Sequence, residues 1–131
     1  MTTEAHKLVS DYLAKCRSRL FVRGEWDCAI FVADVLQILT GKDFAAGYRG
    51  GYSDREGAIE ILPCALAEMP EWLGMKPCQP VNGAVWWAPG CHEEGALGIF
   101  WQGRCLHPGR RGLTSPIKDT SKVKFYTLWQ Q

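Results

Sequence analysis

The chain has 131 residues, of which 47% are hydrophobic and 22% are charged, and its formal net charge is +1. This composition predicts a single globular domain over residues 1–131. The near-neutral charge gives no general attraction to nucleic acid or to an anionic membrane, so neither partner is expected. No apolar run approaches the roughly 20 residues that span a bilayer, and the N-terminus lacks signal-peptide features. We therefore expect synthesis in the cytoplasm and no membrane insertion.

The first part of the chain has apolar residues at helical spacing. Residues 4–18 predict an amphipathic helix. A second helix is expected from Asp27 or Cys28 to Thr40, with Gly41 as its stop. The apolar residues of this second helix occur on too many of its sides to form a single stripe, which indicates a central, buried position.

Shorter elements follow the second helix. Ser53 or Asp54 can cap a third helix that extends to about Leu62. Residues 65–80 contain several prolines and predict a short helix and a loop.

The last part of the chain is typical of strands. Residues 83–87, 96–102 and 123–129 are short segments rich in β-branched and aromatic side chains. Gln102-Gly103 predicts a tight hairpin turn into residues 104–107. Helices followed by antiparallel strands predict an α+β fold, in which the Cys28-headed helix packs on a small sheet.

Cys28 is the candidate nucleophile. The N-terminus of a helix carries a partial positive charge, which favours the reactive thiolate. Asp27 opposes this effect because it places a negative charge beside the thiol. Without a base, a cysteine at the start of a buried helix is more often structural than catalytic, so the rest of the chain must supply one.

Three segments occur in the order expected for a known family. They are DCAIF at residues 27–31, GAVW at 83–86, and ALGIFWQGRCLHP at 96–108. This order resembles the NlpC-type papain-like cysteine peptidases, which cut peptide bonds in bacterial cell walls. The resemblance covers about residues 24–113 and implies a papain-like fold.

The resemblance also implies roles for individual positions. Cys28 takes the place of the nucleophile, Ala96 replaces the base histidine and Ala84 replaces an aspartate. His107 matches the histidine that orients the base, allowing a slip of one residue. His92 could substitute for the base if residues 93–95 turn back, and His107 could do so if the hairpin shifts. Cys28, His107 and His92 are therefore the catalytic candidates.

Three residues are candidates for substrate contact. Asp27 adjoins the nucleophile, and Trp26 and Trp86 belong to an aromatic set that could line a groove or fill the core. Such a groove could bind a peptide or a neighbouring subunit even without catalysis.

The segments TGKD, GYRGGY and GAIEIL at residues 40–43, 47–52 and 57–62 resemble small phage proteins of this superfamily that are encoded among tail genes. The resemblance implies a tail-tip or tail-assembly protein, made in the host cytoplasm and carried in the virion tail. Its partners would be hub or tail-tip subunits. Ala96 indicates impaired catalysis; the alternative is an active cysteine hydrolase that cleaves stem peptides of peptidoglycan during phage entry.

The six cysteines raise a third possibility. Cys91, His92, Cys105 and His107 could in principle hold a metal, but scattered thiols and loop histidines are the simpler interpretation. The cysteine spacings do not cluster as iron–sulfur ligands usually do. Without an export signal we expect free thiols, and no metal or other cofactor.

Overall fold

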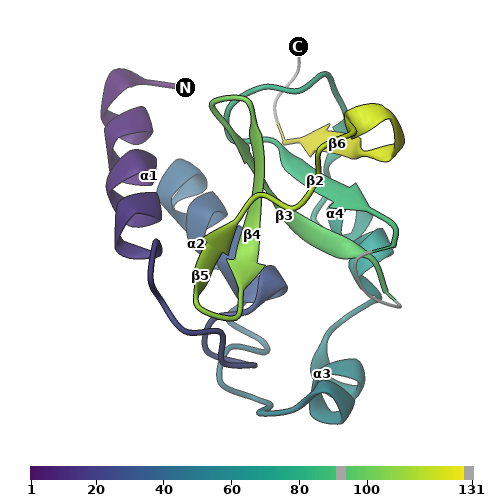
Figure 1. Cartoon of the computed structure of the whole chain (residues 1–131). Helices are drawn as coiled ribbons and strands as arrows, with labels where there is room; N and C mark the ends of the chain where they lie inside the picture. The colour runs from purple at the N-terminus through teal and green to yellow at the C-terminus, as the bar shows by residue number, and fades with distance from the viewer. Residues whose placement is uncertain (91–93, 129–131) are drawn as a thin grey trace.

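The α-helices precede the strands in the computed structural model, which describes residues 1–90 and 94–128 (Figure 1). This part of the chain forms four α-helices, two short 3-10 helices and a six-stranded antiparallel sheet, which confirms the predicted α+β class. None of its helices has both the length and the apolar character needed to cross a membrane. The helices are α1 (Thr3–Lys15), α2 (Cys28–Thr40), α3 (Arg55–Ile61), η1 (Leu66–Glu68), α4 (Met69–Trp72) and η2 (Thr120–Lys122).

The ends of α2 lie where local sequence signals predict them. The Asp27 side chain caps the first turn by accepting a hydrogen bond from the Ile30 amide, and Gly41 ends the helix with a φ of 80°. By contrast, α1 ends at Lys15, three residues before the predicted end. After it the Cys16 carbonyl accepts a hydrogen bond from the Leu113 amide, so the chain leaves the helix to join a distant strand.

The sheet has the order β1-β6-β2-β3-β4-β5. The strands are β1 (Lys76–Pro77), β2 (Val85–Ala88), β3 (Ala96–Trp101), β4 (Arg104–Gly109), β5 (Gly112–Thr114) and β6 (Lys124–Thr127). The sequence predicted β2, β3, the start of β4, and β6. It missed β1 and β5, which have two and three residues and form only by pairing with β6 and β4. Trp129, predicted to extend the last strand, lies outside the described residues.

The two faces of the sheet pack in different hydrophobic clusters. Val85, Leu97 and Ile99 pack in the main core with α2, and α1 packs on α2 in turn (Figure 1). Trp86 and Ala96 alternate with these residues and pack in a second cluster on the other face. That cluster is completed by Ala88, Cys105, Phe125, Cys78, Phe100, Ile117 and Val123.

The strand β4 changes partner along its length. It pairs with β3 as far as Leu106, opposite Ile99, and from His107 onward it pairs with β5. The Trp86 indole donates a hydrogen bond to the Leu106 carbonyl at 3.1 Å. A Cβ atom on Gly98 would lie 2.0 Å from that same carbonyl oxygen, so only glycine fits beneath this contact.

Candidate functional site

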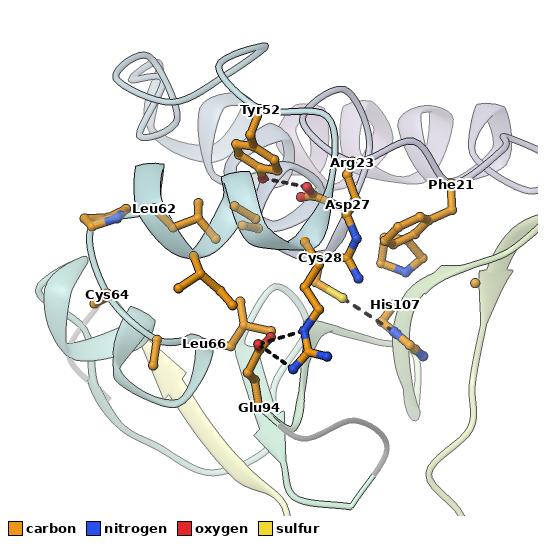
Figure 2. A pocket seen from close by; sticks show the side chains of 18 of the residues that line it. Phe21, Arg23, Asp27, Cys28, Tyr52, Leu62, Cys64, Leu66, Glu94 and His107 are labelled. Carbon is orange, nitrogen blue, oxygen red and sulfur yellow. Dashed lines mark hydrogen bonds and ion pairs between the residues drawn. The ribbon is translucent and has the colours of Figure 1, made fainter.

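A cavity of about 950 Å³ opens beside the N-terminus of α2 (Figure 2). Its wall comes from the segment before α2, from α3 and the loop after it, and from the β4–β5 hairpin. Elements far apart in the sequence therefore meet around the predicted nucleophile. The lining residues are Phe21, Arg23, Asp27, Cys28, Ala29, Tyr52, Arg55, Ala58, Ile59, Leu62, Pro63, Cys64, Ala65, Leu66, Glu94, His107, Pro108, Gly109 and Arg110.

Cys28 and His107 face each other in this cavity. The Cys28 sulfur lies 3.8 Å from Nδ1 of the His107 ring, as the dashed line in Figure 2 marks. Both side chains are buried, with 8% and 7% of their surface exposed. A thiol and an imidazole at this distance can exchange a proton, which is the basic requirement of a cysteine nucleophile with a histidine base.

The position of His107 follows from the partner change of β4. Its backbone pairs with Thr114 of β5, so this residue has left the ladder with β3. Its ring lies edge-on to Trp86, with ring centroids 5.9 Å apart and planes at 80°. The same indole that holds the Leu106 carbonyl therefore also supports the imidazole.

The Cys28 thiol is protonated at neutral pH. Burial raises its pKa to about 12, and the charge of Asp27 raises it further in the same direction. The Leu97 backbone amide, the charge of Arg23 and the Cys28 backbone oppose this shift without cancelling it. The pair is thus arranged as neutral thiol beside imidazole rather than as a preformed thiolate.

Asp27 organises the helix start. Its Oδ1 accepts from the Ile30 amide at 3.0 Å, and its Oδ2 accepts from the Gly24 amide at 3.0 Å and from the Tyr52 hydroxyl at 2.5 Å. It lines the cavity with 5% of its surface exposed. Both carboxylate oxygens are engaged within the protein, which describes a positioning role better than the predicted substrate contact.

Trp26 and Trp86 lie in the core. Their exposed fractions are 1% and 0%, and neither lines the cavity. The Trp26 indole donates to the Tyr12 hydroxyl at 3.2 Å, whereas the Trp86 indole donates to the Leu106 carbonyl. The predicted substrate-binding role does not fit either residue, because no substrate atom could reach a fully covered ring.

Of the two histidines predicted as possible substitute bases, His107 lies beside Cys28. Ala96 is fully buried in the second cluster, paired with Ala88. His107, expected in the orienting place, itself contacts the sulfur because β4 departs from β3. His92, the other candidate base, lies outside the described residues, as does Cys91.

Several cavity residues carried no local signal. Arg55 at the start of α3 forms a salt bridge with Glu94, at 3.3 Å between Nη2 and Oε1 (Figure 2). These residues are 39 positions apart, so no sequence spacing could have paired them. Phe21 and Arg23 stand before the Gly24 turn and reach the cavity through tertiary packing.

The cysteines that the structure describes are free thiols, namely Cys16, Cys28, Cys64, Cys78 and Cys105. Within residues 1–90 and 94–128, no group of three or more His, Cys, Asp or Glu side chains could hold a metal ion. The arrangement around Cys28 is therefore best described as a thiol–imidazole pair in a cavity.

Comparison with known proteins gives one result. No curated protein and no solved structure matches the chain. A family model described as "Domain of unknown function (DUF6950)" matches residues 2–123, which is most of the chain. The chain therefore belongs to the DUF6950 family.

Proposed function

We propose that this protein is a cysteine hydrolase with an NlpC-type, papain-like site that cleaves amide bonds. The observation that carries the proposal is the 3.8 Å approach of the Cys28 sulfur to His107 Nδ1 within a cavity. The nucleophile stands at a helix start and the histidine on a strand of an antiparallel sheet, as the resemblance to that family implies.

The chemistry proceeds through a thioester. Because the Cys28 thiol is neutral, the His107 imidazole takes its proton as the sulfur attacks the substrate carbonyl. The resulting imidazolium then protonates the leaving amine as the C–N bond breaks. Water, deprotonated by His107, attacks the thioester and releases the acid, and the thiol regains its proton.

The helix start also offers a place for the oxyanion. The first backbone N–H groups of an α-helix have no partner within the helix. In α2 the Ile30 amide is capped by Asp27, and the amides of Cys28 and Ala29 precede it. Both residues line the cavity. Their amides and the positive end of α2 would stabilise the negative oxygen of a tetrahedral intermediate.

The biological setting rests on the sequence resemblance. The segments at residues 40–43, 47–52 and 57–62 favour a phage tail-tip or tail-assembly protein, carried in the virion with hub or tail-tip subunits as partners. Stem peptides of peptidoglycan are then the proposed substrate, cleaved as the phage enters the cell.

A second candidate is a tail-assembly protein in which the same site has little activity. The burial of Cys28 and its raised pKa favour this alternative, because both lower the supply of thiolate. In that case the cavity would serve to bind a peptide segment of a neighbouring subunit.

The two candidates differ in one experiment. Purified peptidoglycan and synthetic stem peptides are incubated with the wild type, with Cys28→Ala, and with Cys64→Ala, a matched control whose thiol lines the same cavity. New amine termini are measured by mass spectrometry. A hydrolase loses cleavage in Cys28→Ala alone. Equal product from wild type and Cys28→Ala would remove Cys28 from the mechanism, and no product from any of them would favour the binding protein.

A further inference from the structure

Three arginines and two carboxylates line the cavity, so the positive charges outnumber the negative ones. Glu94 is paired with Arg55, and Asp27 accepts hydrogen bonds from two backbone amides and the Tyr52 hydroxyl. Arg23 and Arg110 remain, and neither forms a salt bridge with another residue in the described part of the chain. With Arg55 and Glu94 paired, these two arginines stand against the single charge of Asp27, so the cavity lining keeps a net positive charge.

Arg23 is held beside the reacting pair. Figure 2 shows its side chain passing Asp27 toward Cys28, with Phe21 next to it. Its guanidinium carbon lies 5.5 Å from the centre of the Phe21 ring. The Phe21 amide donates to the Arg110 carbonyl at 3.2 Å, so a hydrogen bond joins the two segments that carry Arg23 and Arg110.

The side of the cavity away from Arg23 carries apolar side chains as well as the Arg55–Glu94 salt bridge. Figure 2 shows Leu62 and Leu66 on the side of Cys28 away from Arg23. Ile59 on α3 also lines the cavity, although 63% of its surface is exposed. An apolar side chain left open at a cavity wall favours contact with an apolar part of a ligand.

We infer that the substrate carries a carboxylate on one side of the bond that is cut and an apolar group on the other, and that Arg23 binds the carboxylate. This inference rests on the proposed hydrolase function and adds the substrate class. A planar guanidinium pairs with a carboxylate through two parallel hydrogen bonds, which gives direction as well as attraction. The nucleophile stands between the two ends, so bound substrate would present its amide carbonyl to Cys28.

Two alkylating reagents test the charge preference at Cys28. Iodoacetate carries a carboxylate and iodoacetamide is its neutral counterpart. Both alkylate the thiolate with loss of iodide, leaving a carboxymethyl or a carbamidomethyl group on sulfur. Rates are measured at pH 8.5 by mass spectrometry for each cysteine, and the iodoacetate-to-iodoacetamide ratio at Cys28 is divided by that at Cys78, outside the cavity. We expect Arg23→Gln to lower this ratio about 3- to 5-fold, the size of a partly exposed ion pair.

Matched variants separate charge from folding. Arg23→Lys should retain part of the preference, and Arg104→Gln, an exposed arginine on β4 outside the cavity, should retain all of it. Raising the salt concentration should lower the wild-type ratio and leave that of Arg23→Gln unchanged. An identical ratio in wild type and Arg23→Gln would overturn the carboxylate site while leaving Cys28 as nucleophile.

A binding measurement tests the carboxylate site without alkylation of Cys28, and cleavage of stem peptides tests the hydrolase separately. N-acetyl-leucyl-glycine and its C-terminal amide are titrated into the Cys28→Ala protein and followed by ligand-observed NMR. The acid should bind about 3- to 5-fold more tightly than the amide, and Arg23→Gln should abolish the difference. Equal affinities in both proteins would refute the carboxylate site independently of catalysis.

Discussion

The Cys28 sulfur lies 3.8 Å from the Nδ1 atom of His107, although the two residues are 79 positions apart in the chain. One of them begins the central helix α2, and the other stands where β4 leaves β3 for β5. Two independent local structures are therefore needed to form the pair. Each can be disturbed separately, which makes the site open to experiment.

Alkylation of Cys28 should be slow at neutral pH. A pKa of about 12 keeps the thiol protonated, so the thiolate fraction and the rate should rise about tenfold per pH unit above pH 7. In the unfolded chain the pKa of this thiol is near 8.5. The contribution of the protonated Cys28 thiol to the free energy of unfolding is therefore complete below about pH 8.5 and is lost as the pH rises toward 12. Mass spectrometry after iodoacetamide treatment from pH 7 to 10 measures the profile. Fast reaction at pH 7 with an apparent pKa below 8.5 would contradict it.

Replacing His107 by alanine should lower peptide cleavage by about 100- to 10,000-fold, because general-base assistance is lost. The measurement is kcat/KM on stem peptides, with circular dichroism to verify the fold. His6→Ala is the matched histidine control, since His6 packs on Trp101 with ring centroids 4.7 Å apart and does not line the cavity. If His107→Ala cleaves at the wild-type rate, another residue must be the base.

Removing the hydroxyl of Tyr52 should destabilise the start of α2. Tyr52→Phe deletes the 2.5 Å hydrogen bond to the buried Asp27 and should lower the free energy of unfolding by about 1–3 kcal/mol. Asp27→Asn should cost a similar amount, because an amide nitrogen in place of Oδ2 accepts a hydrogen bond from neither Gly24 nor Tyr52. Urea denaturation measures both, and the double variant should lose less than the sum. Strict additivity would mean that the two side chains act independently.

Gly98→Ala should move His107 away from Cys28. An added Cβ would lie 2.0 Å from the Leu106 carbonyl oxygen and 2.7 Å from the Trp86 indole nitrogen, so β4 must shift. We expect a loss of about 1–3 kcal/mol in the free energy of unfolding and a fall in cleavage beyond that due to unfolding. Gly47→Ala, where nothing lies within 4 Å of the new atom, is the control. Unchanged stability and cleavage would show that β4 does not need this close approach.

The sequence predicted those parts of the fold that depend on nearby residues. The start and end of α2 follow from Asp27 and Gly41, and the position of Cys28 at the helix start follows with them. The sequence predicts a contact between His107 and Cys28 only if the hairpin shifts. The contact depends on the Trp86 indole, which crosses Gly98 to reach the Leu106 carbonyl. Aromatic content alone cannot distinguish a groove from a core, and of these two alternatives the structure shows Trp86 and Trp26 in the core. The sequence did not predict the net positive lining of the cavity either, because Arg23 and Arg110 come together only in the tertiary structure.

The hydrogen bonds between the segment after α1 and the β4–β5 hairpin have a consequence for protein engineering. The Cys16 carbonyl accepts from the Leu113 amide, the Arg110 carbonyl accepts from the Phe21 amide, and the Arg17 carbonyl lies against Gly112. Residues 16–28 and 107–113 thus form two hydrogen-bonded segments that hold the Cys28 thiol, the His107 imidazole, Arg23 and Arg110 together. A chimera with a related domain must exchange both segments at once, because exchange of either one would separate the Cys28 thiol from the His107 imidazole.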